Sequence, residues 1–258
     1  MYVDPVHALT QQLRDRKASG EKLAVLTAYD YPTARLFDEA GIDLILVGDS
    51  LGMVVLGLPD TTGVTMNMML HHAAAVRRGV KKAPVIVDLP ANTYGNPDHA
   101  LHNAERLVAA GADAVKLEGG VDMIDSVRAI TKEGIAYVGH IGMLPQSVLK
   151  EGGYKKKGRT EDGASQLLED AVALEEAGAA AIVLESIVPD VAARISSSIK
   201  IPTIGIGAGS ACDAQVLVSH DLLGLFPWFV PPFAVQEANL AMEITRAARK
   251  FVERVKGE

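Results

Sequence analysis

Six ionisable side chains stand at or just after the ends of short apolar runs, where the strands of a parallel sheet would end. Lys116 and Glu118 close one run and are two residues apart, which on a strand puts both side chains on the same face. Other apolar runs lead to Asp49, Asp88, His140 and Glu185. Taken singly, Lys116 and Glu118 could form a structural ion pair, and each strand-end carboxylate could cap a helix. Because all six share one place in their repeats, we favour a common chemical role.

The balance of charge among these residues predicts a bound metal ion. Four carboxylates cannot be packed together without cations, and Lys116 supplies only one positive charge. The remaining negative charge predicts a hard divalent ion with oxygen ligands, most simply one Mg2+ per subunit. Structural zinc is disfavoured because the chain has no Cys/His cluster. Magnesium with open positions polarises a 2-oxo acid, so that a carboxylate base can take the neighbouring proton and leave a stabilised enolate.

A recurring segment carries these residues: a helix end, a glycine and a buried strand that leads to a polar side chain. Copies span residues 39–49, 109–118 and 176–185, with a weaker copy at 132–140. We predict eight strands, near residues 23–27, 42–49, 84–88, 112–118, 135–140, 179–185, 201–207 and 215–218. Alternating helices and continuously apolar strands predict a parallel α/β sheet, and eight units in 258 residues match one (β/α)8 TIM barrel domain over residues 1–258. A doubly wound sheet is the alternative, but no G-x-G-x-x-G opens a helix after the first strand.

Helices are predicted before and between the strands. An N-terminal helix over residues 5–17 carries Val6, Leu9 and Leu13 at helical spacing. The other predicted helices cover about 32–40, 66–79, 97–110, 121–133, 161–177, 188–198 and 234–256. The polar, glycine-rich run 152–159 predicts a long loop, either a solvated surface loop or a lid over the pocket, and we favour the lid. Gly119 and Gly120 are expected to give a substrate room to approach.

The composition disfavours several kinds of partner and location. A net charge of −7 and a pI near 5.5 predict neither nucleic acid nor an anionic membrane as partner. The single cysteine, Cys212, cannot form an intrachain disulfide, which fits a reducing compartment. The first residues lack the basic and then apolar run of a signal peptide, and no apolar stretch is long enough to span a bilayer. The expected location is therefore cytoplasmic.

Five segments that follow one another in the chain resemble the ketopantoate hydroxymethyltransferase family. They are residues 27–30, 47–53, 116–120, 139–146 and 204–209, and the resemblance runs from about residue 10 to about residue 225. It implies a (β/α)8 barrel of the phosphoenolpyruvate/pyruvate superfamily type. It also implies transfer of a hydroxymethyl group from 5,10-methylenetetrahydrofolate to 3-methyl-2-oxobutanoate, which gives 2-dehydropantoate for pantothenate and coenzyme A synthesis. Members of this family are usually large homo-oligomers, often homodecamers.

The resemblance also implies roles for individual residues. Asp49 and Asp88 would be direct magnesium ligands that also contact the substrate, and Glu118 would bind through water or at the edge of the metal's shell. Four further residues would serve the 2-oxo acid: Ser50 at its carboxylate, Lys116 in contact with it, His140 lining the pocket, and Glu185 as general base beside the ketone.

This sequence departs from the family's usual pattern at a few places. Ala91 and Asn92 stand where an aromatic residue and then Gly or Ser are usual, and Ala214 stands where Gly is usual. Residues 226–233 replace a segment that usually carries a lysine, and the loop at residues 154–157 is unusually basic. These changes bear on pocket shape, folate contacts and rate rather than on the class of reaction.

Two other functions are weighed against the transferase. A related 2-oxo acid aldolase or lyase would use the same barrel, but the lyase branch usually carries a Lys-Lys-Cys-Gly-His run, which is absent here. A non-catalytic barrel that serves in binding or assembly predicts loss of some strand-end acids, and all four are present. The transferase is therefore the leading prediction.

Overall fold

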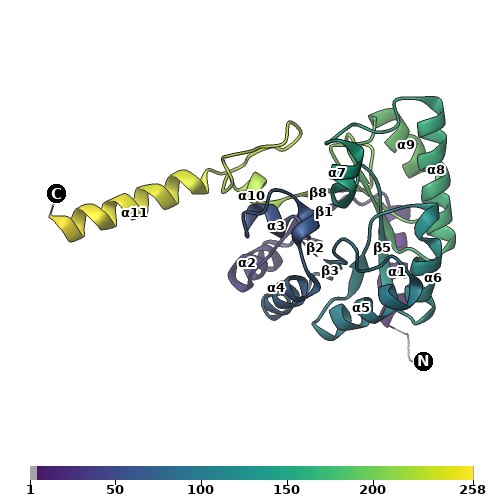
Figure 1. Cartoon of the computed structure of the whole chain (residues 1–258), viewed down its shortest axis with the longest axis horizontal. Coiled ribbons are helices and arrows are strands. Elements are labelled where there is room, and N and C mark those ends of the chain that lie inside the picture. The colour runs from purple at the N-terminus through teal and green to yellow at the C-terminus, as the bar shows by residue number, and fades with distance from the viewer. Residues whose placement is uncertain (1–4, 258) are drawn as a thin grey trace. The chain divides into compact units, whose positions relative to one another are not determined.

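A computed structural model describes residues 5–257, and within this range eight strands form a closed parallel barrel (Figure 1). Each strand pairs with the next one along the chain. The strands are β1 (Leu23–Thr27), β2 (Leu44–Val47), β3 (Val85–Asp88), β4 (Ala114–Lys116), β5 (Ala136–Gly142), β6 (Ala181–Glu185), β7 (Thr203–Ile206) and β8 (Ala214–Leu217). The predicted (β/α)8 barrel is confirmed.

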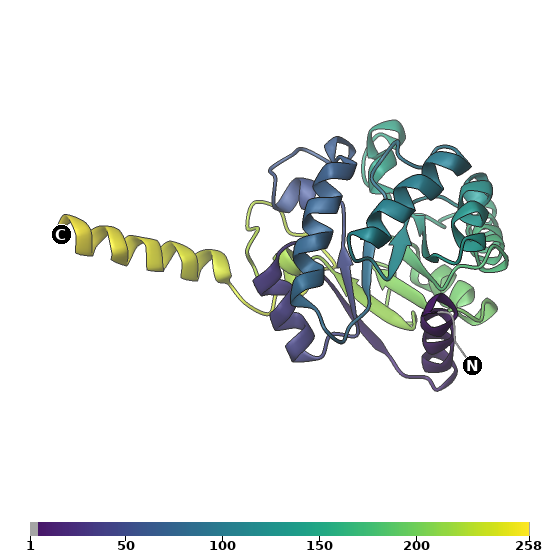
Figure 2. The ribbon, with the colours of Figure 1, turned by 90° about the horizontal axis from the view of Figure 1, so that it is seen from below.

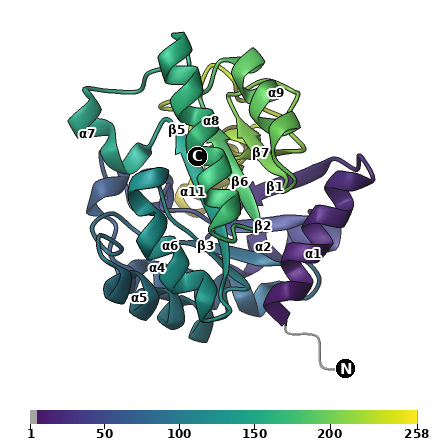
Figure 3. The same cartoon turned by 90° about the vertical axis from the view of Figure 1, so that its right-hand side faces the viewer.

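Helices lie on the outside of these strands, as Figures 2 and 3 show. The helices up to β8 are α1 (Pro5–Ala18), α2 (Tyr31–Ala40), α3 (Leu51–Val54), α4 (Met66–Gly79), α5 (Pro97–Ala109), α6 (Ile124–Lys132), α7 (Val148–Glu151), α8 (Glu161–Glu176) and α9 (Pro189–Ser198). Short 3-10 helices are η1 (Thr61–Gly63), η2 (Val121–Met123) and η3 (Pro145–Ser147). After β8 come α10 (Ser219–Leu222) and α11 (Leu240–Lys256).

Predicted and observed helix ends differ most at two places. The helix predicted from residue 121 begins as the 3-10 turn η2 and becomes α-helical at Ile124. The helix predicted from residue 234 begins only at Leu240, because Asn239 caps it by accepting a hydrogen bond from the Met242 N–H. The backbone before it bonds elsewhere, since the Glu237 N–H donates to the carbonyl of Leu222.

Glycine ends several helices as the recurring segment predicts. Gly41 follows α2 with φ 89°, in the left-handed region that glycine adopts at little cost, and its N–H donates to the Asp38 carbonyl. Gly178 follows α8 in the same region, with φ 97°. Each such turn directs the chain into the next strand and fixes where that strand begins.

Side chains alternate between the two faces of each strand, so that every second one points into the barrel and the last inward ones form the site. Small and branched side chains, among them Leu44, Leu46, Ala136 and Ala181, form one buried cluster inside the barrel. A two-residue step along a strand returns to the same face. That step leads from Ile86 to Asp88, from Ala114 to Lys116, from Val138 to His140 and from Val183 to Glu185. The polar residues therefore lie above the apolar layer, at the carboxyl end of the barrel.

Helix α1 closes the opposite end of the barrel. Leu9 and Leu13 of α1 belong to the buried cluster of the barrel interior. The Lys17 Nζ donates to the Ile201 carbonyl at 3.0 Å and forms an ion pair with Asp213, also at 3.0 Å, and both partners precede strands β7 and β8. The predicted N-terminal helix is confirmed, although Val6 lies outside the residues whose side chains are described.

The chain forms two compact units, one up to Val216 and one from Leu217 onward. In the second unit α11 buries none of its side chains, and Trp228 is 80% exposed. No helix among the described residues has the length and apolar character needed to cross a bilayer. The single domain over residues 1–258 stays a prediction.

Candidate active site

The structure brings the six predicted residues together at the carboxyl end of the barrel. Asp88 and Lys116 end β3 and β4 as register partners, Glu185 ends β6, and His140 lies within β5. Asp49 lies two residues beyond β2, and Glu118 lies two residues beyond β4 rather than on it. Five of the six are at most 5% exposed: Asp49, Asp88, Lys116, Glu118 and His140. The six residues therefore converge, as contacts such as those of Lys116 with Asp88 and His140 show. The chemical role of each residue stays a prediction.

Lys116 lies at the centre of the cluster. Its Nζ is 3.0 Å from Asp88 Oδ1 and 3.2 Å from His140 Nδ1. Burial by itself lowers the pKa of Lys116, but the carboxylates of Asp88, Glu118 and Asp49 outweigh it and the net pKa is raised. Lys116 is therefore a charged ammonium, buried against carboxylates.

His140 is neutral in this setting. Burial, and then the charge of Lys116, hold the pKa of His140 well below its ordinary value. An ammonium can only donate, so His140 Nδ1 accepts from Lys116 and the ring proton lies on Nε2. His140 Nε2 lies 3.2 Å from Glu185 Oε2, without the angle of a hydrogen bond. A neutral imidazole thus separates the lysine from Glu185.

Glu185 is the most accessible acid of the cluster. Its side chain is 16% exposed, compared with 3% for the side chain of Asp88 and 2% for that of Glu118. Burial raises the pKa of Glu185 to about 7, against the opposing charge of Lys116. A carboxylate with a pKa near neutrality suits a general base, because it can both take and release a proton.

We predict that kcat/KM rises with pH through about 7 and levels off above it. The base must be ionised to accept a proton, and Glu185 with a pKa of about 7 is mostly protonated at lower pH. Initial rates at fixed, saturating Mg2+ over about pH 5.5 to 8.5 would measure the profile. A rate that is independent of pH across this range would argue against Glu185 as the base.

Asp49, Asp88 and Glu118 form an acidic group beside Lys116. The Asp49 N–H donates to Asp88 Oδ2 at 3.0 Å, which places the two aspartates against each other. Burial, and then the charge of Asp88, raise the pKa of Asp49 to about 7. Burial, and then Asp49, also raise the pKa of Glu118 well above its ordinary value. The carboxylates of Asp49 and Glu118 are thus short of positive charge.

These carboxylates fit a hard divalent cation. Glu118 Oε1 is buried and makes no hydrogen bond. Among the described residues, no three His, Cys, Asp or Glu side chains already converge on a point that could hold an ion. Magnesium does not require such a cage, because it commonly binds through one or two carboxylates and keeps several water molecules. Asp49 and Asp88 as direct ligands, with Glu118 at the edge of the shell, stay a prediction.

Ser50 lies beside this group, at the start of α3. Its Oγ is 2.8 Å from the hydroxyl of Tyr29, which is 2% exposed. The carbonyl of Tyr29 in turn lies 2.6 Å from Nδ1 of His72 on α4, so this histidine ties α4 to the segment that follows β1. Tyr29 was not predicted as a site residue, although it stands in the segment 27–30 that resembles the family.

Two further residues of the site were missed by sequence reasoning. The Gln146 Nε2 donates to Asp49 Oδ2 at 2.8 Å, and the Gln146 backbone N–H donates to Glu118 Oε2 at 3.0 Å. The Tyr94 hydroxyl donates to Gln146 Oε1 at 2.5 Å. Gln146 ends the segment 139–146 that begins with the strand of His140, which is the one signal that could have pointed to it.

The glycine pair after Glu118 serves packing rather than substrate access, so that expectation is wrong. A Cβ on Gly119 would lie 2.5 Å from Met123 Cγ, and one on Gly120 would lie 2.1 Å from Asp170 Cγ of α8. Gly119 also has φ 128°, which favours glycine. The space is filled by the protein's own side chains, and the pair lets the chain turn closely past α8.

The loop predicted at residues 152–159 is joined to the segment after Glu185. The Lys157 N–H donates to the Ser186 carbonyl at 2.8 Å, and the Val188 N–H donates to the Lys157 carbonyl at 3.0 Å. Ser186 has φ 49°, an unusual conformation for a residue with a side chain. Tyr154 of this loop is 3.8 Å from Met53 Sδ, and burial and the charge of Glu185 raise its pKa. The phenol thus lies toward the site, and the lid stays a prediction.

The structure shows where the residues that depart from the family's usual pattern lie. Asn92 has φ 65°, a conformation that glycine and asparagine adopt more readily than most residues. Ala214 is 1% exposed and packs in the barrel interior. Residues 226–233 belong to the second compact unit.

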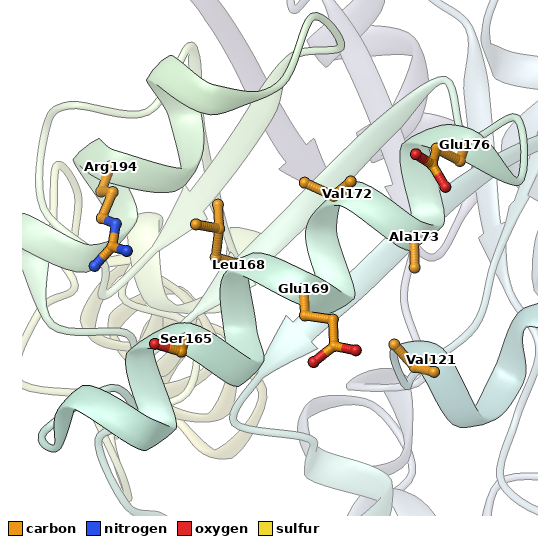
Figure 4. Close-up of a pocket in the computed structure, with 8 residues that line it drawn as sticks. All are labelled: Val121, Ser165, Leu168, Glu169, Val172, Ala173, Glu176 and Arg194. Atoms are coloured by element: carbon orange, nitrogen blue, oxygen red, sulfur yellow. The ribbon is translucent and has the colours of Figure 1, made fainter.

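A separate groove of about 490 Å3 runs along the outer face of α8 (Figure 4). Its lining is Val121, Ser165, Leu168, Glu169, Val172, Ala173, Glu176 and Arg194. It contains none of the strand-end residues, and it has no lysine or histidine to act beside its glutamates. The chemistry therefore belongs to the barrel mouth and not to this groove.

Several proteins of known structure have a similar barrel. A phosphoenolpyruvate phosphomutase from Streptomyces platensis subsp. rosaceus superposes with a TM-score of 0.66 at 19% identity, over 97% of this chain and 87% of that one. 2,3-Dimethylmalate lyase, a member of the PEP mutase/isocitrate lyase superfamily, superposes with a TM-score of 0.62 at 18% identity, over 100% of this chain and 89% of that one. At this identity the likeness shows the fold, a (β/α)8 barrel, and the superfamily type stays a prediction.

Comparison of sequences identifies the family. The profile described as ketopantoate hydroxymethyltransferase matches residues 7–258. The 3-methyl-2-oxobutanoate hydroxymethyltransferase of Ignicoccus hospitalis is 54% identical over 92% of this chain and 90% of its own. The protein of the same name from Syntrophus aciditrophicus is 50% identical over 96% of this chain and 92% of its own. The chain therefore belongs to the ketopantoate hydroxymethyltransferase family and is a hydroxymethyltransferase.

Proposed function

We propose that this enzyme transfers a hydroxymethyl group from 5,10-methylenetetrahydrofolate to 3-methyl-2-oxobutanoate and forms 2-dehydropantoate, a step of pantothenate synthesis. The relatives that carry the 3-methyl-2-oxobutanoate name are 50–54% identical. The observation that carries the proposal is the arrangement of Glu185, His140 and Lys116 beside three further carboxylates at the barrel mouth.

Glu185 acts as the base in this proposal. The C–H bond beside the ketone breaks, its proton passes to the Glu185 carboxylate, and its electron pair is delocalised onto the ketone oxygen. The resulting carbon nucleophile forms a C–C bond to the one-carbon unit as the first of its two C–N bonds to the folate breaks. The oxygen of water then replaces the second C–N bond and becomes the new hydroxyl group, and the two folate nitrogens take up the proton held by Glu185 and one proton of the water. A pKa of about 7 lets Glu185 perform the first step near neutral pH.

Other residues hold the 2-oxo acid in place. Lys116, charged and buried, contacts the bound acid and offsets negative charge as it grows on the ketone oxygen. Ser50 binds the substrate carboxylate, and Tyr29 fixes the Ser50 hydroxyl. His140 lines the pocket between Lys116 and Glu185 and stays neutral, so it adds no charge that would hold the base ionised at too low a pH.

Magnesium is part of the proposal. Asp49 and Asp88 would hold it directly, with Glu118 at the edge of the shell, and Asp49 and Asp88 would also contact the substrate. When bound, the ion supplies Lewis-acid polarisation of the ketone. The unpartnered Glu118 Oε1 and the raised pKa of Asp49 support this donor set. We also propose that the enzyme is cytoplasmic and works as a homo-oligomer, of which a homodecamer is the expected form.

Proton exchange without the folate tests the first step. In deuterated water with Mg2+ and 3-methyl-2-oxobutanoate, the enzyme should replace the C–H proton beside the ketone by deuterium, as followed by NMR. Removal of divalent ions with EDTA should stop the exchange, and added Mg2+ should restore it. Exchange that persists after thorough chelation would exclude the proposed metal role.

Product formation tests the second step and separates the transferase from its relatives. Addition of 5,10-methylenetetrahydrofolate should give 2-dehydropantoate and tetrahydrofolate in equal amounts. An enzyme that exchanges the proton but makes no product with this folate would instead be an aldolase or lyase with another electrophile. A protein that does neither would be a non-catalytic barrel.

A further inference from the structure

Gln146 connects four segments of the barrel mouth. It lies in η3, a few residues beyond the strand of His140, and is half-buried. Its Nε2 donates to Asp49 Oδ2 at 2.8 Å and to the Leu89 carbonyl at 3.0 Å, so it reaches the segments that follow β2 and β3. Its backbone N–H donates at 3.0 Å to Glu118 Oε2, beyond the end of β4. One residue thus contacts two of the three carboxylates proposed to serve the metal.

The hydrogen bonds leave one orientation for the Gln146 amide. Both N–H bonds of Nε2 point at acceptors, the Asp49 carboxylate and the Leu89 carbonyl. Oε1 receives the hydrogen bond of the Tyr94 hydroxyl. Reversing the amide would place its oxygen against two acceptors and its NH2 group against the Tyr94 hydroxyl. The two acceptors therefore fix which end of the amide faces Asp49, and the Tyr94 hydroxyl holds the oxygen end in place.

Gln146 forms a hydrogen bond with one oxygen of the Asp49 carboxylate and with one oxygen of the Glu118 carboxylate. Asp49 Oδ2 and Glu118 Oε2 are held by Gln146, whereas Glu118 Oε1 is buried without a hydrogen bond. A carboxylate with one oxygen held in place has its second oxygen aimed in a defined direction. Partners that orient metal ligands in this way commonly contribute 10- to 100-fold in metal affinity.

We propose that Gln146 is a positioning residue that aims the second carboxylate oxygens of Asp49 and Glu118 at one bound divalent cation, with Tyr94 holding the oxygen of its amide. The inference rests on the proposed metal role of these carboxylates. It gives the Gln146 side chain the task of holding Asp49, and the Gln146 backbone the task of holding Glu118. Side-chain substitutions therefore break the first contact and leave the second in place.

The test compares metal affinity among variants of the full-length protein. Calorimetry measures Mg2+ binding, and the electron paramagnetic resonance signal of free Mn2+ gives an independent dissociation constant. Gln146→Leu keeps much of the volume and removes the donor, and its dissociation constants should rise by about 10- to 100-fold. Tyr94→Phe keeps Gln146 but frees its amide, and the rise should be smaller. Activity of Gln146→Leu should recover as Mg2+ is raised, since the loss lies in occupancy.

Gln166→Leu is the matched control. Gln166 lies on α8, where its amide also donates to a carboxylate, Asp170 Oδ1 at 3.3 Å, on an exposed surface. This variant should bind both ions as the unmodified enzyme does. If Gln146→Leu fails to fold, as judged by circular dichroism, Tyr94→Phe carries the test, because it removes the hydrogen bond to Gln146 Oε1.

The outcomes separate this inference from the proposed function. If the unmodified enzyme binds neither ion, the metal role itself fails. If it binds them and folded Gln146→Leu and Tyr94→Phe bind them equally well, the metal role stands and the positioning role is overturned. Weaker binding in both variants, with the control unchanged, supports Gln146 as the positioning residue.

Discussion

Replacing Glu185 by glutamine is expected to lower kcat by about 10²- to 10⁴-fold, the range over which a general base contributes. The substitution keeps the shape of the side chain and an oxygen near His140 Nε2, which lies 3.2 Å from Glu185 Oε2. What it removes is the ability to accept a proton. Because Glu185 is not among the proposed metal ligands, Mg2+ affinity should stay close to that of the unmodified enzyme.

Two measurements check this expectation. Deuterium exchange into 3-methyl-2-oxobutanoate should fall together with product formation, since both need the same proton transfer. Glu39→Gln makes the same chemical change on the exposed surface of α2, where Glu39 pairs with Arg35, and should leave both rates unaltered. Exchange at the normal rate in Glu185→Gln would assign the base to another residue.

Replacing Asp88 by alanine is expected to reduce both activity and stability. Loss of a direct metal ligand removes several kcal/mol of transition-state stabilisation, or on the order of 10²- to 10³-fold in kcat/KM. The same change leaves the buried Lys116 ammonium without the partner that lies 3.0 Å away. Breaking a buried ion pair in this way costs about 3–5 kcal/mol in the free energy of unfolding.

A double variant separates the two effects. In Asp88→Ala, Lys116→Met the ion pair is removed as a whole, so the free energy of unfolding in urea should recover part of its loss, while Asp49 and Glu118 still lack the charge of Lys116. Activity and Mg2+ affinity should stay low, because neither substitution restores a metal ligand. Recovery of activity along with stability would mean that Asp88 serves the fold and not the reaction.

Most strands could be predicted from sequence because they are apolar runs preceded by a helix end and a turn; β8 is the exception, since no helix lies between β7 and β8. Gly41 and Gly178, with their left-handed backbones, mark two of these turns in the sequence itself. The position of the site could be predicted for a related reason. In a parallel barrel, the last inward-pointing side chains of the strands all lie at the carboxyl end. Asp88 and Glu185 are such last residues.

Contacts between distant segments could not be predicted in this way. Gln146 is 97 residues from Asp49 along the chain, and no spacing shows that a glutamine in a short 3-10 turn reaches it. The glycine pair at residues 119–120 was misinterpreted because its true neighbour, Asp170, lies on another helix. The start of α11 was predicted too early, because the sequence does not show that Asn239, rather than an earlier residue, caps the helix. Tertiary packing, rather than local pattern, fixes each of these features.

Helix α1, which closes the amino end of the barrel, also offers a point for attachment to a surface. The chain's one cysteine, Cys212, is 1% exposed and would react slowly with a coupling reagent. Gln12 lies on an exposed face of α1, so Gln12→Cys would provide an accessible thiol at the end opposite Glu185. A protomer immobilised through that thiol on a sensor chip would keep its barrel mouth turned toward the flowing solution, which suits direct measurement of metal and substrate binding.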